Sequence, residues 1–311
     1  MGETFLQLTT SNRATTVGIL YCGDMGSAVG KLLRKAGLRV VTTFEGRSPA
    51  TQDRALNSGI EILPTLDDVV AQSHIVFSLV LPSSALETAR QYTNRDQLRS
   101  EGSIFVEANS IGLETLEEIE RLMGEQDIPL VDASFHGVAH RLEDLAILYV
   151  SGPKARVVEA LCQDFLPVSY LGTRIGPATA MKLLMAGVSK GLAGLFVEVG
   201  AIAERADMLD PFLDSCRHFY PAVMTVIDRI LPTYPRHAAR RVGEVREIEQ
   251  LGQASRLRPG MIHEAGRWIQ MIASIQWDLM RLEAPADVRT IVHSVARACS
   301  PENPKKADVE V

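Results

Sequence analysis

Residues 17–41 read VGILYCGDMGSAVGKLLRKAGLRVV. An apolar run at the start is followed by two glycines, Gly23 and Gly26, and then by apolar residues spaced three and four apart. This order is typical of a buried strand that leads through a tight turn into an amphipathic helix. A second β-branched run begins at Arg39. The stretch therefore predicts the first strand–helix–strand unit of an α/β sheet.

The same alternation of short apolar runs and segments of helical period continues from residue 14 to about 175. Each run is apolar on consecutive positions, as expected for a strand that is buried on both faces. The pattern indicates a doubly wound α/β domain with a parallel sheet. Strands are predicted at 15–21, 39–44, 74–80, 103–109, 129–135 and 145–152, and helices at 25–37, 49–59, 113–124 and 152–165.

A second domain with no strand pattern follows, and it is predicted to be all-helical over 176–300. Its first helix, from Ala178 to about Asp207, is apolar on nearly every face. Because such a helix must be buried on every face, we expect it to pack against a second subunit of a homodimer. The polar residues 1–13 and 301–311 are predicted to be tails outside the two domains 14–175 and 176–300.

The composition excludes several classes of protein. A net charge of -6 with no cluster of Lys and Arg argues against nucleic acid as a partner. Four cysteines without a CxxC pair suggest neither a zinc ribbon nor a disulfide framework. No apolar run reaches the roughly 20 residues that cross a bilayer, and residues 1–13 lack the features of a signal peptide. We therefore expect a cytoplasmic protein with no membrane partner.

The turn after the first predicted strand has the spacing Tyr21-x-Gly23-x-x-Gly26. In dinucleotide-binding folds three glycines stand here: the first forms the turn, the second admits the pyrophosphate, and the third lets helix and strand touch. Only the first is replaced in this chain. By itself the spacing is compatible both with a cofactor site and with tight packing of a strand against a helix.

The end of the second predicted strand, residues 43–50, lies where such folds contact the adenine ribose. Glu45 would accept hydrogen bonds from a free ribose diol and thus favour NAD. Arg47 and Ser48 could instead bind a 2′-phosphate, through a forked guanidinium and a hydroxyl donor. The alternative is a solvated turn that caps the helix starting near Pro49. We expect NADP, with NAD the less favoured cofactor.

Five motifs, in the same order along the chain, resemble the β-hydroxyacid dehydrogenase superfamily, which includes 3-hydroxyisobutyrate and 6-phosphogluconate dehydrogenases. The resemblance covers residues 14 to about 207, and the EGRS turn at 45–48 is most similar to a less-studied branch. The motifs are YCGDMG at 21–26, Leu81-Pro82, VEANSIG at 106–112, DASFHGV at 132–138, and IGPATAMKLLMAG at 175–187.

The resemblance implies a Rossmann-type doubly wound sheet followed by a helical domain, and hydride transfer between a nicotinamide and a carbon that bears a hydroxyl or carbonyl oxygen. It assigns to Lys182 the role of acid/base on that oxygen, and it places substrate near Asn109, Ser110, His136 and Gly137. The cofactor-binding residues that follow are Tyr21, Cys22, Gly23, Asp24, Met25, Gly26, Glu45, Arg47, Ser48, Leu81, Pro82 and Asn109.

A lysine on a buried apolar helix loses hydration, and its pKa should fall toward neutrality, where proton transfer is useful. The alternative for Lys182 is a side chain that extends to solvent. Lys190, two turns further on, is expected to be solvated.

Two departures from the family pattern argue against a small 3-hydroxy acid bound in the standard way. Residue 186, one turn after Lys182, is Ala where the family often has Asn. Residues 136 and 138 are His and Val where the family has Ser and Gly. His136 could donate to a substrate oxygen or could merely fill a bend.

Other functions remain open. Imine reduction occurs on related scaffolds, although generally with another residue at the lysine position, and a nicotinamide-binding protein without catalysis is also compatible. The pair His136 and His140 has the spacing of zinc ligands on a helix but follows a strand, so no metal is expected. His263, Trp268, Trp277 and Asp278 lie in a helical segment that could close the site across a dimer, but aromatic residues at such spacing more often pack the core, so none is assigned as catalytic.

Overall fold

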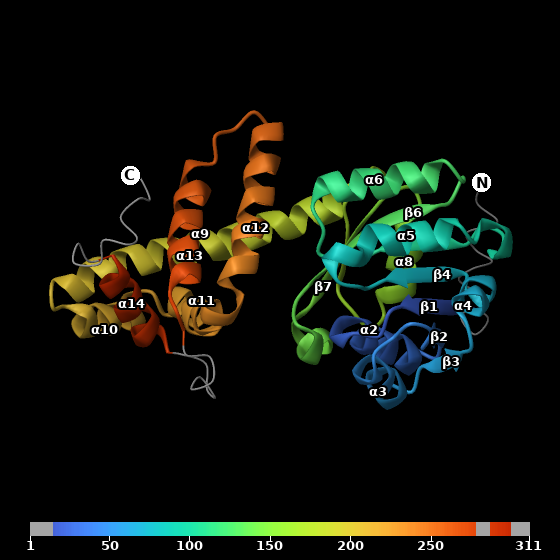
Figure 1. Ribbon diagram of the computed structural model, residues 1–311, viewed down its shortest axis with the longest axis horizontal. Coiled ribbons are helices and arrows are strands. Elements are labelled where there is room, and N and C mark those ends of the chain that lie inside the picture. Colours follow the sequence, from blue (N-terminus) through green and yellow to red (C-terminus); the bar gives the residue numbers. More distant parts are fainter. Residues whose placement is uncertain (1–14, 278–286, 300–311) are drawn as a thin grey trace. The chain divides into compact units, whose positions relative to one another are not determined.

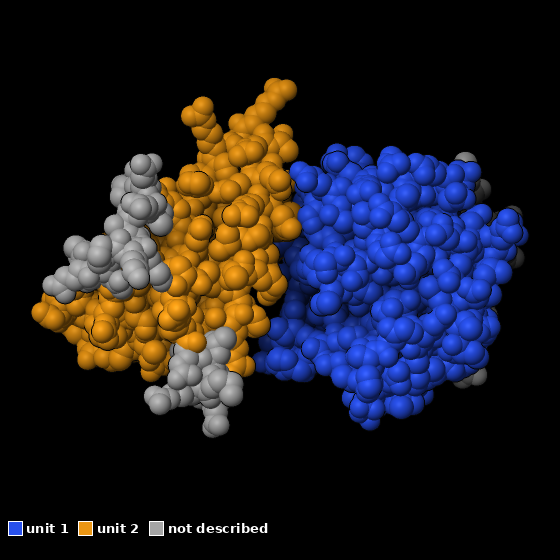
Figure 2. All heavy atoms as spheres, in the orientation of Figure 1, with its two compact units in different colours: residues 1–182 blue, residues 183–311 orange. Residues whose placement is uncertain are grey.

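The computed structural model describes residues 15–277 and 287–299. The chain forms two compact units, residues 1–182 and 183–311 (Figure 2). The tails predicted at 1–13 and 301–311, and Asp278, lie outside the described residues. The domain boundary predicted at 175/176 stays a prediction.

The first unit is built on one eight-stranded sheet with the order β3-β2-β1-β4-β5-β6-β7-β8 (Figure 1). All six predicted strands are present, and two short strands, β3 and β8, were not predicted. The strand order reverses between β1 and β4, and in open α/β sheets ligands bind at the carboxyl ends of the strands beside such a point. The strands are Thr16–Leu20 (β1), Arg39–Thr43 (β2), Glu61–Leu63 (β3), Ile75–Ser78 (β4), Ile104–Glu107 (β5), Leu130–His136 (β6), Ile147–Ser151 (β7) and Val168–Tyr170 (β8).

The sheet is mostly parallel, which confirms the predicted doubly wound fold, and among the described strands the exception to the parallel arrangement is β7. This strand pairs antiparallel with β6, in a register that joins His136 to Ile147 and Asp132 to Ser151. The link from β6 to β7 contains only a 3-10 turn and one helical turn, Leu142–Leu145 (α7). A parallel connection needs a crossover of a dozen or more residues, so this link can only turn the chain back.

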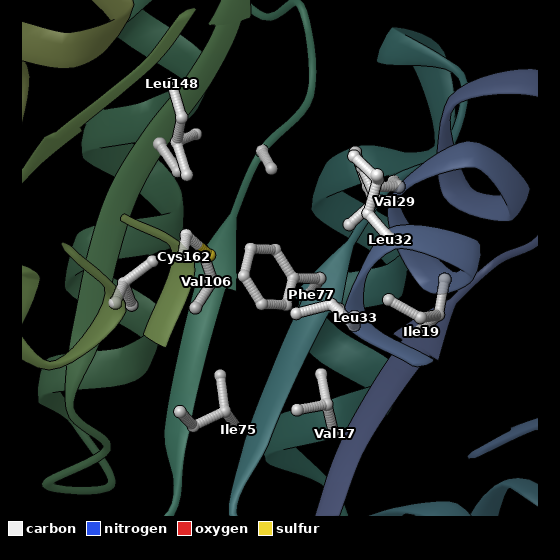
Figure 3. Packing of buried hydrophobic residues seen from close by; sticks show 14 of the residues in the cluster. Val17, Ile19, Val29, Leu32, Leu33, Ile75, Phe77, Val106, Leu148 and Cys162 are labelled. Carbon is white, nitrogen blue, oxygen red and sulfur yellow. The ribbon is translucent and has the colours of Figure 1, made fainter. Parts of the chain in front are cut away.

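Helices cover both faces of the sheet, as predicted for strands that are apolar on consecutive positions. One core packs α2, α3 and α8 against residues such as Val17 and Phe77, and Figure 3 shows Phe77 among Ile75, Val17 and Val106. The other core packs α4, α5 and α6 against the alternate residues, such as Leu20 and Val76. These helices are Asp24–Lys35 (α2), Pro49–Asn57 (α3), Leu66–Gln72 (α4), Ala85–Thr93 (α5), Leu113–Gly124 (α6) and Ala155–Cys162 (α8).

The predicted long apolar helix is α9, Pro177–Arg205, which begins in the first unit and continues into the second. The described part of the second unit holds only helices around one apolar core. Its other α-helices are Leu209–Phe219 (α10), Pro221–Ile230 (α11), Tyr234–Ala254 (α12), Gly260–Ser274 (α13) and Val288–Ala298 (α14).

Lys182 and Lys190 interrupt the apolar run that forms α9, but the helix as a whole is long and apolar enough to cross a membrane, and 44% of its most apolar window is buried inside the protein. Core helices of soluble proteins have the same length and composition, so α9 is weak evidence for a membrane span.

The prediction that Lys190 is solvated is wrong. Lys190 is only 5% exposed, and its Nζ lies 2.6 Å from Oε2 of Glu244 on α12. An unpaired ammonium would be costly to bury, so the carboxylate partner is what allows a lysine on this face of α9.

Candidate active site

The turn after β1 leaves the first N–H groups of α2 without a side-chain cap. Gly23 is the N-cap residue and makes no side-chain hydrogen bond, and the first intrahelical bond runs from Ser27 N to the Gly23 carbonyl. A Cβ added at Gly23 would meet no atom within 4 Å. Exposed N–H groups beside open space at a helix N-terminus form a site that fits the pyrophosphate of a dinucleotide.

Gly26 has the complementary role in this turn. A Cβ at Gly26 would lie 2.1 Å from the Tyr21 carbonyl oxygen, so helix and strand can touch only at a glycine. The same carbonyl accepts the Gly23 N–H at 2.9 Å. The turn is therefore as tight as the glycine fingerprint requires, although Tyr21 replaces the first glycine.

The other predicted residues of the turn contribute in different ways. Asp24 pairs with Arg54 of α3 at 2.8 Å, which offsets a negative charge beside the helix N-terminus. The Cys22 thiol is buried in the core, where desolvation raises its pKa to about 11, and Met25 packs against the same core. Cys22 can thus border a cofactor only through its backbone.

The end of β2 brings Glu45, Arg47 and Ser48 together. Oε2 of Glu45 accepts the N–H of Leu66 at 2.8 Å, and Ser48 caps α3 by accepting the N–H of Thr51. The Arg47 guanidinium lies over the Tyr21 ring, with 3.9 Å between Cζ and the ring centroid. Arg47 thus faces the turn after β1, whereas the Glu45 and Ser48 side chains also hold helix starts.

Asn109 fixes the loop that carries Leu81 and Pro82. Its Oδ1 accepts the Val80 N–H at 2.5 Å, and its Nδ2 donates to Ser78 Oγ at 2.8 Å. Asn109 is buried, whereas Leu81 is 72% exposed just before the 3-10 turn that begins at Pro82. The amide of Asn109 therefore acts on this loop, which presents an apolar side chain at the carboxyl edge of the sheet.

The start of α9 is held by Asp132 of β6, a residue that the sequence analysis did not single out. Asp132 is 0% exposed, and its carboxylate accepts five hydrogen bonds. The donors are the N–H groups of Gly176, Ala178 and Thr179 and the hydroxyls of Ser151 and Thr179. A carboxylate from a neighbouring strand thus serves as the cap of this helix.

Lys182 lies on α9 just beyond this capped first turn and reaches the end of β5. Its Nζ donates to Ser110 Oγ at 2.5 Å, and the lysine is half-buried. Two residues that the sequence assigned to the site, one from the loop after β5 and one from α9, are therefore in direct contact.

A row of polar residues crosses the sheet next to this contact. Ser78, Glu107, Asp132 and Ser151 are register neighbours on β4, β5, β6 and β7, and all four are buried. Oε1 of Glu107 accepts the Asn109 N–H at 2.9 Å, whereas Oε2 has no hydrogen-bond partner among the residues that the structure describes. Burial raises the pKa of Glu107 to about 7, with a smaller contribution from the charge of Asp132.

His136 and Gly137 end β6 at the same edge of the sheet. His136 is half-buried. At Gly137 φ is 156°, and an added Cβ would lie 2.7 Å from Cβ of Ala146, so only glycine fits there. In the described ranges no three His, Cys, Asp or Glu side chains are grouped as metal ligands.

The histidine and tryptophans noted in the helical half make contacts inside the second unit. His263 Nδ1 lies 2.8 Å from Glu249 Oε1, and Trp268 donates to Glu198 at 3.0 Å. Trp268 and Trp277 also pack against the helical core. The contacts of His263, Trp268 and Trp277 thus hold the helices of the second unit together.

We expect the raised pKa of Glu107 to make folding stability depend on pH. The folded protein retains this proton up to about pH 7, whereas a Glu side chain in the unfolded chain loses it near 4.5. The stabilisation is therefore complete below pH 4.5 and is lost as the pH rises through 7. Between pH 4.5 and 8 the wild type should lose on the order of 3 kcal/mol more than Glu107→Gln, as measured by urea unfolding.

Glu101→Gln, at an exposed position, is the control and should follow the wild type. If the free energies of unfolding of the wild type and of Glu107→Gln change with pH in the same way, the raised pKa of Glu107 is contradicted.

Comparison with known families matches two regions of the chain. Residues 16–166 match the NAD binding domain of 6-phosphogluconate dehydrogenase, and residues 203–272 match a domain of unknown function, DUF1932. An uncharacterised 28.5 kDa protein of Methanothermus fervidus is 27% identical over 248 residues, which are 79% of this chain and 94% of the relative.

Solved structures share the fold over most of the chain. A conserved protein of unknown function, described as structurally similar to 3-hydroxyacid dehydrogenases, is 27% identical with a TM-score of 0.68, over 83% of this chain and 96% of its own. The 3-hydroxyisobutyrate dehydrogenase of Mycobacterium tuberculosis is 16% identical with a TM-score of 0.69, over 90% and 99%. Imine reductases of Myxococcus stipitatus, in complexes with NAD+ or NADP+, share the fold with TM-scores of 0.56 and 0.54.

These matches confirm the predicted nicotinamide-binding domain and the resemblance to 3-hydroxyacid dehydrogenases, and they support the general class of NAD(P)-dependent oxidoreductases. The chain thus combines an NAD-binding domain of the 6-phosphogluconate dehydrogenase type with a helical DUF1932 region, an arrangement that is consistent with the β-hydroxyacid dehydrogenase superfamily.

Proposed function

We propose that the protein is an NADP-dependent dehydrogenase or reductase that acts on a hydroxy acid or a related carbonyl compound, with Lys182 as the general acid/base. The observation that carries this proposal is the contact of Lys182 Nζ with Ser110 Oγ at 2.5 Å. It lies at the carboxyl end of β5, the edge of the sheet at which ligands bind in this type of fold.

In this proposal Lys182 exchanges one proton with the substrate oxygen. During reduction the ammonium gives a proton to the carbonyl oxygen as it becomes a hydroxyl, and during oxidation the neutral amine takes that proton back. When bound, a nicotinamide supplies or accepts the hydride. Ser110 accepts a hydrogen bond from Nζ and so orients the lone pair or proton that Lys182 presents.

His136 and Gly137 are proposed to border the substrate from the end of β6. Gly137 lets the end of β6 pack against Ala146, and the half-buried imidazole of His136 beside it can donate to an oxygen of the substrate. Since His136 replaces the family serine, we propose a substrate other than a small 3-hydroxy acid bound in the standard way.

The preference for NADP over NAD is proposed from the end of β2. Arg47 offers a guanidinium beside the turn after β1, and Oε2 of Glu45 is already engaged with the Leu66 N–H. A guanidinium binds phosphate in a forked geometry, whereas a carboxylate would repel it. The dissociation constants of NADPH and NADH for the wild type test this preference.

Imine reduction is the competing activity, because imine reductases share the fold. A lysine that exchanges a proton with oxygen favours the hydroxyl or carbonyl reaction. A panel of hydroxy acids, aldehydes and cyclic imines separates the two, since turnover of imines alone would replace the proposed substrate class. Tight NADPH binding without turnover of any compound would instead favour a non-catalytic protein.

We also propose a cytoplasmic homodimer. All four cysteines are free thiols, as is usual in a reducing compartment.

The dimer is proposed from α9. One face of this helix leaves an apolar stripe exposed, at Leu184, Val188, Leu195, Val199 and Ile202. Two copies related by a two-fold axis would place this stripe against itself, and each would bury the apolar surface of the other.

Replacing Lys182 by Met should lower kcat by about 100-fold or more, because the proton no longer has a donor or acceptor. The affinity for NADPH, measured by fluorescence titration, should change little. Lys154→Met, at an exposed lysine of the first unit, is the control and should keep full activity. An unchanged kcat in Lys182→Met would refute the assigned role.

Replacing Gly23 by Ala should weaken NADPH binding at least tenfold and leave folding stability within about 1 kcal/mol of the wild type, the usual effect of Ala at a helix N-cap. The new methyl group meets no protein atom but would lie where the pyrophosphate must approach. Gly124→Ala, which also meets no atom and lies at the end of α6, is the matched control. Equal NADPH affinities for the two variants would show that the turn does not bind the cofactor.

The dimer should have twice the mass of one chain in light scattering at micromolar concentration. Val188→Glu combined with Ile202→Glu should yield monomers, because two carboxylates would be buried in the proposed interface. A wild-type protein that remains monomeric, or that associates with lipid vesicles through α9 instead, would contradict the proposal.

A further inference from the structure

The residue that replaces the first glycine of the turn contacts the residue at the end of the second strand. Tyr21 follows β1, and its ring lies under the Arg47 guanidinium with 3.9 Å between Cζ and the ring centroid. Twenty-five residues separate the two positions in the sequence, and the pairing of β1 with β2 brings them together.

The Tyr21 ring is held rigidly. Tyr21 is 6% exposed and belongs to the apolar core that includes Val41, Leu63 and Leu66. Its backbone is fixed as well, because its N–H donates to the Leu79 carbonyl at 3.4 Å and its own carbonyl accepts the Gly23 N–H at 2.9 Å. The ring is therefore anchored by the sheet and by the core, and it cannot follow movements of the Arg47 loop.

Arg47 has a second anchor at its Nε. This atom donates to the Glu45 carbonyl at 3.1 Å, and the Arg47 backbone N–H donates to the Phe44 carbonyl at 2.9 Å. Within the described ranges the two terminal amino groups of Arg47 make no hydrogen bond or ion pair. These groups remain to bind two oxygens of one phosphate, the geometry in which a guanidinium recognises phosphate most strongly.

The charged side chains near Arg47 are paired with other groups. Oε2 of Glu45 is directed to the Leu66 N–H, and the nearby Arg95 is paired with Asp67 at 2.6 Å. Burial raises the pKa of Tyr21, so the ring is a neutral phenol throughout the physiological range. The contact is thus a cation–π interaction, which requires the ring and not the hydroxyl.

We propose that Tyr21 is a specificity-determining residue that positions Arg47 for the 2′-phosphate of NADP, and this inference rests on the proposed use of that cofactor. An unsupported arginine loses rotamer freedom when it binds phosphate. Stacking on a fixed ring orders the guanidinium before NADP binds. The entropy cost of binding is therefore smaller and the affinity for NADP is higher. A glycine at position 21 would have no ring on which Arg47 could stack.

The experiment compares the dissociation constants of NADPH and NADH for the wild type and four variants: Tyr21→Phe, Tyr21→Leu, Arg47→Ala and the double variant Tyr21→Leu/Arg47→Ala. NADH lacks the 2′-phosphate and reports any general damage to the turn. Thermal melting shows whether each variant is folded.

Tyr21→Phe should keep the wild-type ratio of the two constants, because it retains the ring. Tyr21→Leu should weaken NADPH binding about fivefold and change NADH binding less than twofold, in line with a cation–π contact at a partly exposed site. The double variant should bind NADPH no more weakly than Arg47→Ala, because Tyr21 acts only through Arg47.

The outcomes separate this inference from the proposed function. If Arg47→Ala loses NADPH selectively but Tyr21→Leu keeps the wild-type ratio, or weakens both cofactors equally, the positioning role is wrong and the phosphate clamp stands. If Arg47→Ala does not lose NADPH selectively, the clamp itself is wrong.

Should Tyr21→Leu fail to fold, Arg47→Lys replaces it. This variant keeps the charge on an exposed turn but has no flat face to stack, so a wild-type cofactor ratio would overturn the inference.

Discussion

The buried carboxylate of Asp132 is the constraint on which the candidate site depends. A fully buried charge is tolerated only when its oxygens are bonded, and here three backbone N–H groups and two hydroxyls supply five hydrogen bonds. Because the three N–H groups belong to the start of α9, the carboxylate both caps this helix and fixes it to β6. Lys182 follows directly, so its contact with Ser110 is a consequence of this anchorage.

The rest of the site is likewise held by side-chain contacts between the ends of neighbouring strands. Asn109, after β5, holds the loop of Leu81 through the Val80 N–H, and Tyr21, after β1, holds the guanidinium of Arg47. In each case a side chain at the carboxyl end of one strand contacts the loop that follows a neighbouring strand of the sheet. The candidate site residues are thus held in place by contacts between neighbouring strands and their loops.

The sequence predicted those parts of the structure that depend on local pattern. The apolar runs located six strands, and the glycine spacing located a turn in which Gly26 is sterically required. Helix α4 was missed although Thr65 and Asp68 form a capping box, because its seven residues are too short for a periodic signal. The antiparallel β7, the buried pair of Lys190 with Glu244, and the cap from Asp132 all depend on residues far apart in the chain, which no local pattern encodes.

Hydrogen exchange in Asp132→Asn tests the central claim most directly. An amide side chain cannot accept all five hydrogen bonds, since one of its two polar atoms is a donor. The account predicts faster exchange at the amides of Ala178 and Thr179 and a lower kcat, with protection of the amides of β1 and β4 unchanged. Asp164→Asn, at an exposed position, should match the wild type. Unchanged protection at the start of α9, together with wild-type turnover, would contradict the account.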